Sequence, residues 1–399
     1  MKIKKDKKSE FVKELESSKK RQYDKSLPLE VRQEKRYDKL DVIFEEIANK
    51  ENKYLLYCPD IPFACSLVKI IYEYAKIMKD AGFNVVVLHE VDGFVPKWLD
   101  FEWVKDIPKG YLSSKKERTQ PEWKFAPSDT IIIPEGFFSI MKSFYQFNPL
   151  HKVVLALGYN GLASMEPGVN WGVLGFKDVI CISEDIKDKY QQVFPALNYY
   201  VTSYVVNEEL LTPVNSNEVA PTIGLMIRDR ELASKIVNIF TNKYPHFNYF
   251  QFKVLKKQTV KQYCEELRKC AVIVFADDKS AIPAPLVEAV CAKVPVITHQ
   301  NNFLKTFVGI ESFNVIDISD EFAFADYLAE FCNLWSSNST ALFQTTGSSA
   351  DLIIDNFRES NVKESLIKVV NLLQEEKIKT FTAIDEMVQK GELDNYEKK

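Results

Sequence analysis

Short, almost continuously apolar runs recur along the chain, and they constrain its fold more than any other feature. "KYLLYCPD" begins at residue 53, and "FNVVVLHEV" follows after a gap of helical length. A strand with one face in water would alternate polar and apolar residues. Runs without alternation indicate strands covered on both faces, as in a parallel sheet flanked by helices. The pattern therefore predicts an α/β protein.

The segment between these two runs, "SLVKIIYEYAKIMKDAG", predicts an amphipathic helix. Its apolar residues recur at intervals of three and four, and Gly82 provides the stop signal. "DTIIIPEG", "HKVVLALGYN", "KDVICISED" and "YYVTSYVV" continue the strand series. After a polar stretch with two prolines at 207–221, the series starts again with "TIGLMIRD" and closes with "SFNVIDI".

Two consecutive series of this kind predict two Rossmann-like α/β domains that face each other across a cleft. The expected segments are a charged, basic leader (1–50), a first Rossmann-like domain (51–206), a linker (207–221), a second Rossmann-like domain (222–345), C-terminal helices that pack back towards the first domain (346–375) and a charged, loosely held tail (376–399). Ligands of such sheets bind beyond the carboxyl ends of the strands.

Composition agrees with a globular two-domain protein. Of the 399 residues, 46% are apolar and 27% are charged. No apolar run reaches the ~18 residues of a membrane span, and the N-terminus has no signal peptide. The cysteines form no CxxC pair and the histidines show no metal-ligand spacing, so we expect reduced cysteines, no metal site and a cytoplasmic location.

Charge is distributed unevenly. The net charge of −4 does not favour nucleic-acid binding by the molecule as a whole. Residues 1–36, however, hold thirteen Lys or Arg against seven Asp or Glu. This leader is either a solvated, partly helical segment or a basic arm that contacts a polyanion or a protein partner.

At this point the ordered segments resemble a known family. "YCPDIP…VKIIYEYAKIMKDAGFNVVVLH", "DTIIIPEG", "DVICISEDIKDKY" and "APLVEAVCAKVPVIT" are similar to glycosyltransferases with two Rossmann-like domains (the GT-B fold), especially the retaining type that uses nucleotide sugars. The resemblance covers roughly residues 53–345. It implies that the first domain faces the acceptor and that the second domain binds the nucleotide-sugar donor.

The resemblance implies a donor site in the second domain. Glu288 matches the Glu that accepts hydrogen bonds from the ribose hydroxyls, and Arg228 matches one member of a basic pair that neutralises the diphosphate. Asp229 stands where that pair often has a Lys, so Arg230 either substitutes for it or simply starts the next helix. Carboxylate and guanidinium groups suit a vicinal diol and a phosphate respectively. The alternatives are a solvent-facing Glu on an amphipathic helix, and surface arginines paired with Asp229 or Glu231. The remaining candidates for donor contact are Ser280, Pro285 and Leu286.

The donor motif also departs from the family pattern. Ser280 stands where the family carries a second Glu that contacts the donor sugar, and Asp277 or Asp278 would have to replace that acid. The usual consecutive glycines of the first loop are replaced in "IPFACSLVK", and the Gly after the family's Cys is Lys293. Without these glycines the backbone approaches a ligand less easily.

On the first domain, candidates follow the predicted strands. Glu135, Asp60 and His89 are expected to be catalytic, and Lys69 and Asn160 to lie on the acceptor side. Helix caps and turn residues are the plain alternative for each. "VDGFVPKWLDFEW" is expected to form a substrate-side loop, although core packing explains its rings equally well.

Two functions remain open from the sequence. The first is a glycosyltransferase that moves a sugar from a nucleotide sugar to an acceptor, and a saccharide, a lipid carrier, a protein and a modified nucleic acid are all compatible acceptors. It would need no cofactor and no metal, because a basic pair is present and "FADDKS" is the only acidic cluster near the cleft. The second is a degenerate relative that acts as a binding or scaffolding subunit.

Overall fold

The computed structural model describes residues 52–389 of the chain. Within this range the description omits 92, 114–124, 127, 146–149, 214, 216–217, 256–258, 277–283, 300–312, 316–319 and 349. The basic leader therefore lies outside the described residues. So do Ser280 and the two aspartates at 277 and 278.

The first domain contains a seven-stranded parallel sheet among the described residues, with the order β3-β2-β1-β4-β5-β6-β7. Its strands are β1 (Lys53–Tyr57), β2 (Asn84–Val91), β3 (Lys109–Ser113), β4 (Thr130–Pro134), β5 (His151–Ala156), β6 (Asp178–Cys181) and β7 (Asn198–Val201). The central strands β4 and β6 are buried along their whole length. This agrees with the unbroken apolar runs in the sequence.

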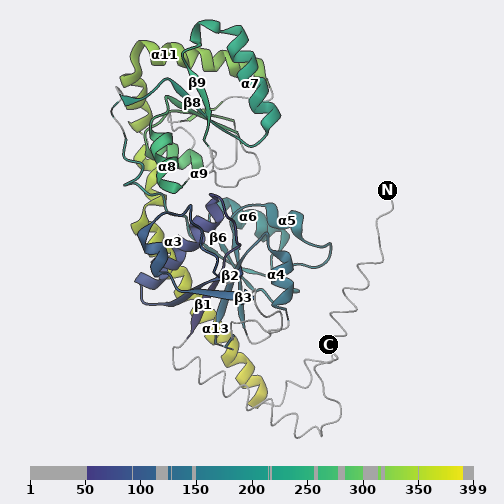
Figure 1. Cartoon of the computed structure of the whole chain (residues 1–399). Coiled ribbons are helices and arrows are strands. Elements are labelled where there is room, and N and C mark those ends of the chain that lie inside the picture. Colours follow the sequence, from purple (N-terminus) through teal and green to yellow (C-terminus); the bar gives the residue numbers. More distant parts are fainter. Residues whose placement is uncertain are drawn as a thin grey trace.

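The second domain contains a five-stranded parallel sheet in the described part of the chain, with the order β12-β11-β10-β8-β9. Its strands are β8 (Thr222–Ile227), β9 (Gln251–Val254), β10 (Val272–Ala276), β11 (Val296–Thr298) and β12 (Phe313–Val315). The predicted α/β architecture with two Rossmann-like domains is confirmed. Figure 1 shows the two sheets in separate lobes, one above the other.

Helices connect the strands and cover the sheets. They are α3 (Ser66–Asp80), η1 (Glu102–Asp106), α4 (Phe138–Ser143), α5 (Asn160–Ser164), α6 (Glu184–Val193), α7 (Arg230–Lys243), η3 (Pro245–Phe247), α8 (Val260–Arg268), α9 (Ala284–Cys291), α11 (Glu321–Ser348), α12 (Ala350–Ile354), η4 (Asp355–Phe357) and α13 (Glu359–Gln389). Local signals fix several of their ends. Thr259 and Gln262 form a capping box on α8, and Ser183 caps α6.

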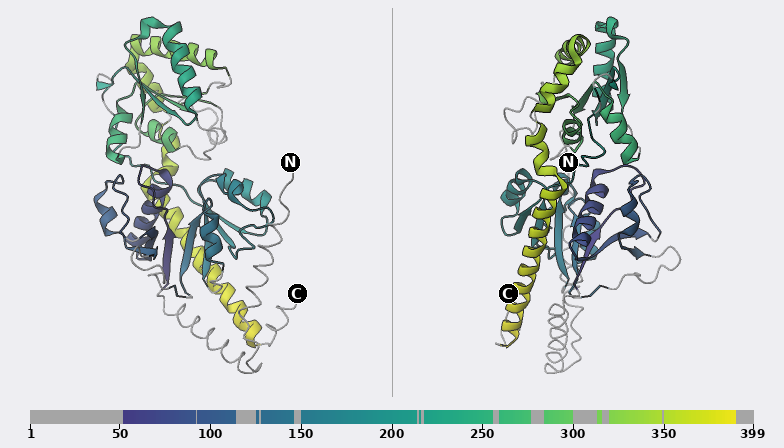
Figure 2. Two further views of the ribbon diagram at one scale, coloured as in Figure 1. Left: turned by 45° about the vertical axis from the view of Figure 1, so that its right-hand side comes forward. Right: turned by 90° about the vertical axis from the view of Figure 1, so that its left-hand side faces the viewer.

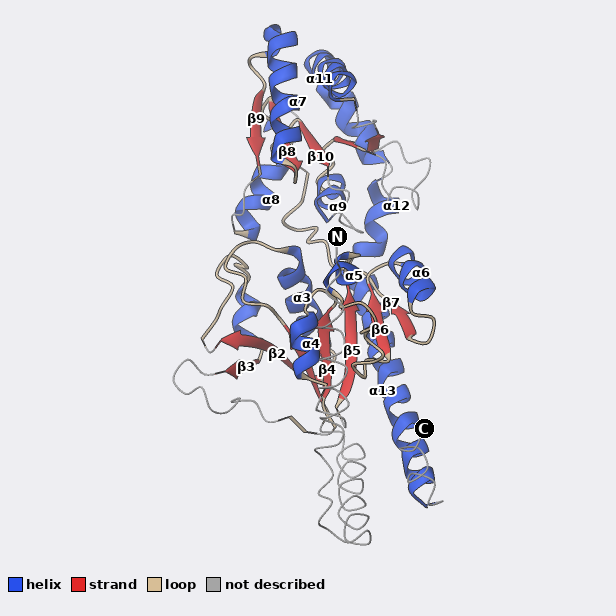
Figure 3. Cartoon of the chain, turned by 90° about the vertical axis from the view of Figure 1, so that its right-hand side faces the viewer, coloured by secondary structure: helices blue, strands red, loops and turns tan. Residues whose placement is uncertain are grey.

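In both sheets the strand order reverses at one point, and this point indicates where a ligand would bind. The reversal falls between β1 and β4 in the first sheet and between β8 and β10 in the second. The crevice beyond the carboxyl ends of strands at such a point is the usual ligand site of an open α/β sheet. The junction of the lobes, where α3, α8 and α9 meet, is visible in Figure 3.

The two lobes share a hydrophobic core. One continuous cluster of buried side chains runs from the first sheet through α8, α9 and the inner face of the second sheet to α13. It includes Ile71 of α3, Cys264 of α8, Leu286 of α9 and Leu366 of α13. A second cluster fills the outer face of the second sheet, beneath α7 and α11.

Helix α13 extends much further than the sequence indicated. The chain was expected to be loosely held from residue 376, but the helix continues to Gln389 and runs beside the first lobe (Figure 2). It contacts α3 and β7, as predicted for helices that pack back on the first domain. Lys377, within the expected tail, is only 3% exposed and donates to the carbonyl of Ser128.

The end of α9 keeps its backbone shape although its usual residue is absent. Lys293 has a φ of 57°, the left-handed conformation that favours Gly. Its N–H donates to the carbonyl of Val290 at 2.9 Å, and the N–H of Val294 donates to that of Ala289 at 2.9 Å. This pair of hydrogen bonds is the Schellman motif that ends many helices. The Gly-to-Lys departure therefore strains the turn without removing it.

Candidate functional site

A cavity of about 390 Å³ lies between the two lobes. Its volume is within the range of small-molecule sites. The first lobe contributes the start of α3 and the loop after β2, and the second contributes the ends of β8, β9 and β10 with parts of α8 and α9. The lining residues are Ala64, Cys65, Ser66, Lys69, Trp98, Leu225, Met226, Ile227, Arg228, Val254, Leu255, Val260, Tyr263, Phe275, Pro285 and Glu288.

The start of α3 lies at the wall of this cavity. Cys65, the residue before the helix, has an extended backbone and makes no capping hydrogen bond with its side chain. Cys65 and Ser66 both line the cavity. The first N–H groups of a helix lack partners within it, and together with the helix dipole they favour an anion. This end of α3 can therefore hold a phosphate group.

Glu288 of α9 reaches the cavity as predicted, but its carboxylate already has two partners. Lys69 of α3, in the other lobe, approaches Glu288 Oε1 with its Nζ at 3.2 Å. The hydroxyl of Tyr263 in α8 donates to Glu288 Oε2 at 3.0 Å. Glu288 is 7% exposed, so its charge is buried and needs such partners. The proposed donor-site acid thus also joins the two lobes.

Lys69, predicted on the acceptor side, lines the same cavity from α3 of the first lobe. Besides Glu288, its Nζ lies 3.6 Å from Oε1 of Glu73, one turn further along α3, and 3.5 Å from the carbonyl oxygen of Val205. Burial acts to lower the pKa of Lys69, but the charges of Glu73 and Glu288 outweigh it and raise the pKa. Lys69 is therefore a permanent cation at the edge of the cavity.

Arg228 lines the cavity and Arg230 does not belong to its described lining. Arg228 follows β8 directly and is exposed. Asp229 caps α7, because its Oδ1 accepts from the N–H groups of Glu231 and Leu232 at 2.8 and 3.2 Å. Arg230 is the exposed first residue of that helix. Of the predicted basic pair, the structure brings only Arg228 to the site.

Of the other residues predicted to contact the donor, one lines the cavity and one is buried in the core. Pro285 lines the cavity at the start of α9. Leu286 is 0% exposed, belongs to the hydrophobic core and is not part of the described lining, so its donor contact stays a prediction. Ser280 lies outside the described residues.

Asp60 and His89 lie together inside the first lobe. His89 is fully buried, and its Nδ1 is 2.9 Å from Asp60 Oδ1 while its Nε2 is 2.9 Å from the hydroxyl of Tyr72. Asp60 Oδ2 also accepts from the N–H of Val91 at 2.9 Å. These contacts hold the loop after β1 against the end of β2. None of these four residues belongs to the described lining of the cavity.

Glu135 is buried beyond the end of β4. Its Oε2 accepts from the N–H of Leu157 at 2.9 Å, and the residue is 6% exposed. Burial raises its pKa to about 7, against the opposing effect of backbone hydrogen bonds. A Cβ on Gly161 would lie 2.6 Å from Glu135 Cγ, so this close approach requires glycine. Glu135 supports the loop before α5, whose first residue is the predicted acceptor-side Asn160.

Two buried residues near Glu288 escaped the sequence analysis, Tyr263 and Glu73, whereas Trp98 belongs to the loop that was expected on the substrate side. Trp98, in the aromatic loop, lines the cavity with its Nε1 donating to the carbonyl of Ile61 at 3.1 Å. Its own carbonyl accepts from the N–H of Val260 in the other lobe at 3.0 Å. Tyr263 and Glu73 sit in amphipathic helices among residues of similar type. Nothing in their local sequence distinguished them from ordinary helix residues.

No group of His, Cys, Asp and Glu with the arrangement of a metal site occurs among the residues that the structure describes. All seven cysteines are free, and only Cys65 is partly exposed. Within the described part of 52–389, no helix combines the length and the apolar character that crossing a bilayer requires.

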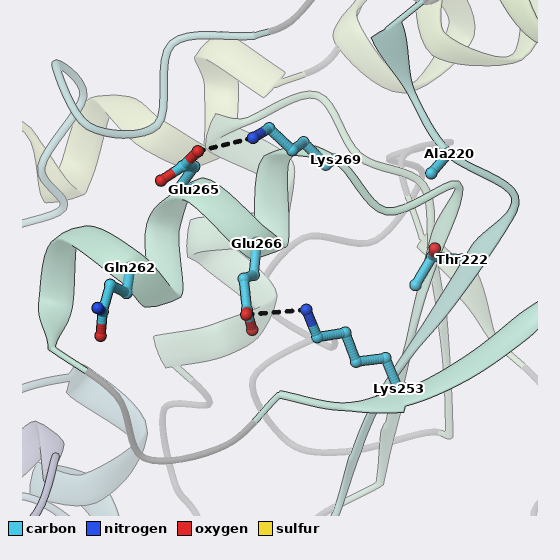
Figure 4. Close-up of a pocket in the computed structure, with 7 residues that line it drawn as sticks. All are labelled: Ala220, Thr222, Lys253, Gln262, Glu265, Glu266 and Lys269. Carbon is cyan, nitrogen blue, oxygen red and sulfur yellow. Dashed lines mark hydrogen bonds and ion pairs between the residues drawn. The ribbon is translucent and has the colours of Figure 1, made fainter.

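A second cavity, of about 600 Å³, opens on the outside of the second lobe (Figure 4). Its charged residues are paired with one another: Lys253 with Glu266 at 2.8 Å, and Lys269 with Glu265 at 2.7 Å. Such exposed pairs are weak and leave little net charge for a ligand. The cavity between the lobes is therefore the better candidate site.

Comparison with known proteins supports this fold by structure alone. No family model matches the chain, and no curated protein matches its sequence. Sucrose-phosphate synthase from Thermosynechococcus elongatus is similar over 81% of this chain and 99% of its own, with a TM-score of 0.59 and 11% identity.

Two further solved structures show the same likeness. The pneumococcal O-GlcNAc transferase GtfA, in complex with UDP and GlcNAc, has a TM-score of 0.55 and 10% identity over 81% of this chain and 99% of its own. HepE from Anabaena, in complex with UDP, has a TM-score of 0.54 and 11% identity over 80% and 99%. At such low identity the likeness establishes the fold.

Proposed function

We propose that the chain is a glycosyltransferase that binds a nucleotide-sugar donor in the cavity between its lobes. The observation that carries this proposal is the convergence of three groups on one cavity: Arg228 after β8, Glu288 on α9 and the N-terminus of α3. Two of these groups suit a diphosphate and the third suits a ribose diol. The GT-B fold, which the chain shares with UDP-bound transferases, supports it.

In this proposal Arg228 and the α3 N-terminus hold the diphosphate while the sugar departs. Negative charge grows on the leaving phosphate at that moment, and fixed positive charge and N–H dipoles stabilise it. A cation that is already in place makes a metal unnecessary for this role. We therefore retain a metal-independent, retaining transfer as part of the proposal, with Glu135, Asp60 and His89 as the predicted catalytic groups.

The transferred sugar needs an acceptor. It would enter from the first lobe, and a saccharide, a lipid carrier, a protein and a modified nucleic acid all fit the proposal. The predicted leader offers a further contact with a protein or a polyanion. Neither point affects the donor test below.

The test is thermal unfolding of the protein with UDP-, GDP-, ADP- and CMP-sugars, each at about 1 mM. A ligand at ~100 times its Kd adds about 2.7 kcal/mol and raises the midpoint by a few degrees. Arg228→Ala should weaken the binding of the stabilising sugar nucleotide by about 1.5–3 kcal/mol, the scale of a hydrogen bond to a charged group. Arg230→Ala, at the exposed neighbouring arginine, is the matched control and should bind like the wild type.

The outcomes separate the two functions. A shift with one class of nucleotide, reduced in Arg228→Ala and kept in Arg230→Ala, supports the transferase. A flat panel contradicts it and leaves the binding or scaffolding subunit as the working hypothesis. Equal effects of both Arg substitutions would mean that the nucleotide binds elsewhere.

A further inference from the structure

Five side chains form a buried polar cluster where the lobes meet. We call it the Lys69 cluster; its members are Lys69, Glu73, Tyr204, Tyr263 and Glu288. The Lys69 ammonium lies between two carboxylates, 3.2 Å from Glu288 and 3.6 Å from Glu73. The side chains of Lys69 and Glu73 are 12% and 7% exposed, so the charges are largely removed from water.

Two atoms of this cluster lack hydrogen-bond partners. Glu73 Oε2 and the hydroxyl of Tyr204 are both buried and unpartnered among the described residues. Tyr204 is 2% exposed and close enough to Glu288 and Glu73 that their charges, added to its burial, raise its pKa. Buried polar atoms without partners are costly. The cluster therefore has hydrogen-bonding capacity that this conformation leaves unused.

Donor binding at Glu288 conflicts with the arrangement seen here. Both carboxylate oxygens of Glu288 are engaged, one by Lys69 and the other by Tyr263. A ribose diol that donates to Glu288 would compete with the ammonium for the same oxygen. Lys69 cannot simply lose its partner, because an unpaired buried charge is strongly unfavourable. It needs a second acceptor within reach of its flexible side chain.

Glu73 is that acceptor. It stands one turn from Lys69 on α3, the i, i+4 spacing at which side chains meet on a helix. Its Oε1 is already near the ammonium, and its Oε2 is unpartnered among the described residues. Resting on the donor site proposed above, we propose that a bound donor displaces Lys69 from Glu288 to Glu73, which makes Glu73 a positioning residue for the donor.

This exchange moves a proton. Burial raises the pKa of Glu73 to about 7, opposed by Lys69, and Glu288 and Glu359 raise it further. The groups that face it are Lys69 on its own helix, Glu288 from α9, Glu359 from α13 and the hydroxyl of Tyr204. When the ammonium approaches, the ionised form of Glu73 is favoured, and its carboxyl proton passes to the buffer. Donor binding near pH 7 therefore releases a fraction of one proton.

The test is isothermal titration of the protein with UDP-glucose at pH 7, in two buffers of different ionisation enthalpy. If the thermal panel singles out another base, the corresponding nucleotide glucose replaces it. The diphosphate of these compounds carries no group that titrates near neutrality. The wild type should release between zero and one proton per ligand, and Glu73→Gln should release less and bind roughly tenfold more weakly. Glu184→Gln, at an exposed carboxylate of α6 that pairs with Lys187, is the control and should behave like the wild type.

The same Glu73 substitution made in a Lys69→Met variant distinguishes a positioning role of Glu73 from a purely structural one. In Lys69→Met there is no ammonium to relocate, so adding Glu73→Gln should change the Kd less than about twofold. An equal loss in both backgrounds would assign Glu73 a merely structural role and overturn the inference. Binding of UDP-glucose with the same proton count in the wild type and Glu73→Gln would also overturn it, while leaving the transferase proposal intact. If no nucleotide sugar binds at all, both this inference and the transferase proposal are contradicted.

Discussion

Glu135 gives the clearest pH dependence at the scale of single residues. Its folded-state pKa is about 7 because of burial, above the ordinary value of 4.5. The folded protein therefore binds this proton more tightly than the unfolded chain does. The stability that comes from the protonated form is fully present below about pH 4.5 and is lost as the pH rises through about 7.

We expect Glu135→Gln to raise the free energy of unfolding at pH 8 by roughly 1–3 kcal/mol, since an amide cannot ionise yet keeps an acceptor for Leu157. Urea denaturation at several pH values measures it, and the difference from the wild type should shrink below about pH 5. Glu184→Gln, at an exposed carboxylate, is the control. A constant difference at all pH values would contradict the raised pKa.

The residues that line the cavity between the lobes show how far single-residue prediction reached. Glu288, Pro285 and Arg228 were found from a local motif, because the motif ties each residue to a strand end or a helix start. The partner of Glu288 was not found. Lys69 stands 219 positions away, and no local periodicity reveals which buried side chains meet across two domains.

Lys377 provides a test at the scale of elements. Among the described side chains of α13 beyond Leu373, it is the buried one, and it donates to the carbonyl of Ser128 under the first sheet. We expect Lys377→Ala to loosen residues 374–389 from the lobe while the rest of α13 stays docked. Hydrogen exchange should then rise in that segment alone. Lys379→Ala, at an exposed lysine paired with Glu376, should leave the exchange unchanged.

Strands and helices with a clear pattern of apolar residues were predicted from the sequence, and those without such a pattern were missed. Unbroken apolar runs identified the central strands, since only covered strands show them. The short edge strand β3, "KGYLS", has no such run, and the sequence analysis passed over it. The end of α13 was taken for a loose tail because its residues are mostly charged. A buried lysine cannot be distinguished from an exposed one in the sequence, so the sequence did not indicate that the end of α13 packs against the first lobe.

At the scale of the whole molecule, the shared core predicts that the two lobes unfold together. One hydrophobic cluster includes the first sheet, α8, α9 and α13, so neither lobe keeps its full core without the other. Differential scanning calorimetry should show a single transition whose calorimetric and van't Hoff enthalpies agree. Two resolved transitions would contradict the shared core. The fold class and the repeated domain were predictable from the sequence, but this continuity across the cleft was not.

The course of α13 also has a consequence for the order in which the protein is made. The helix lies against α3 and β7 of the first lobe, yet its residues leave the ribosome after the whole second lobe. During synthesis, at about 5–20 residues per second, the stretch from the end of β7 to the end of α13 takes about 10–40 s, and for that time the nascent first lobe has this surface uncovered. A newly made chain therefore exposes an apolar face to chaperones until its C-terminal helix arrives.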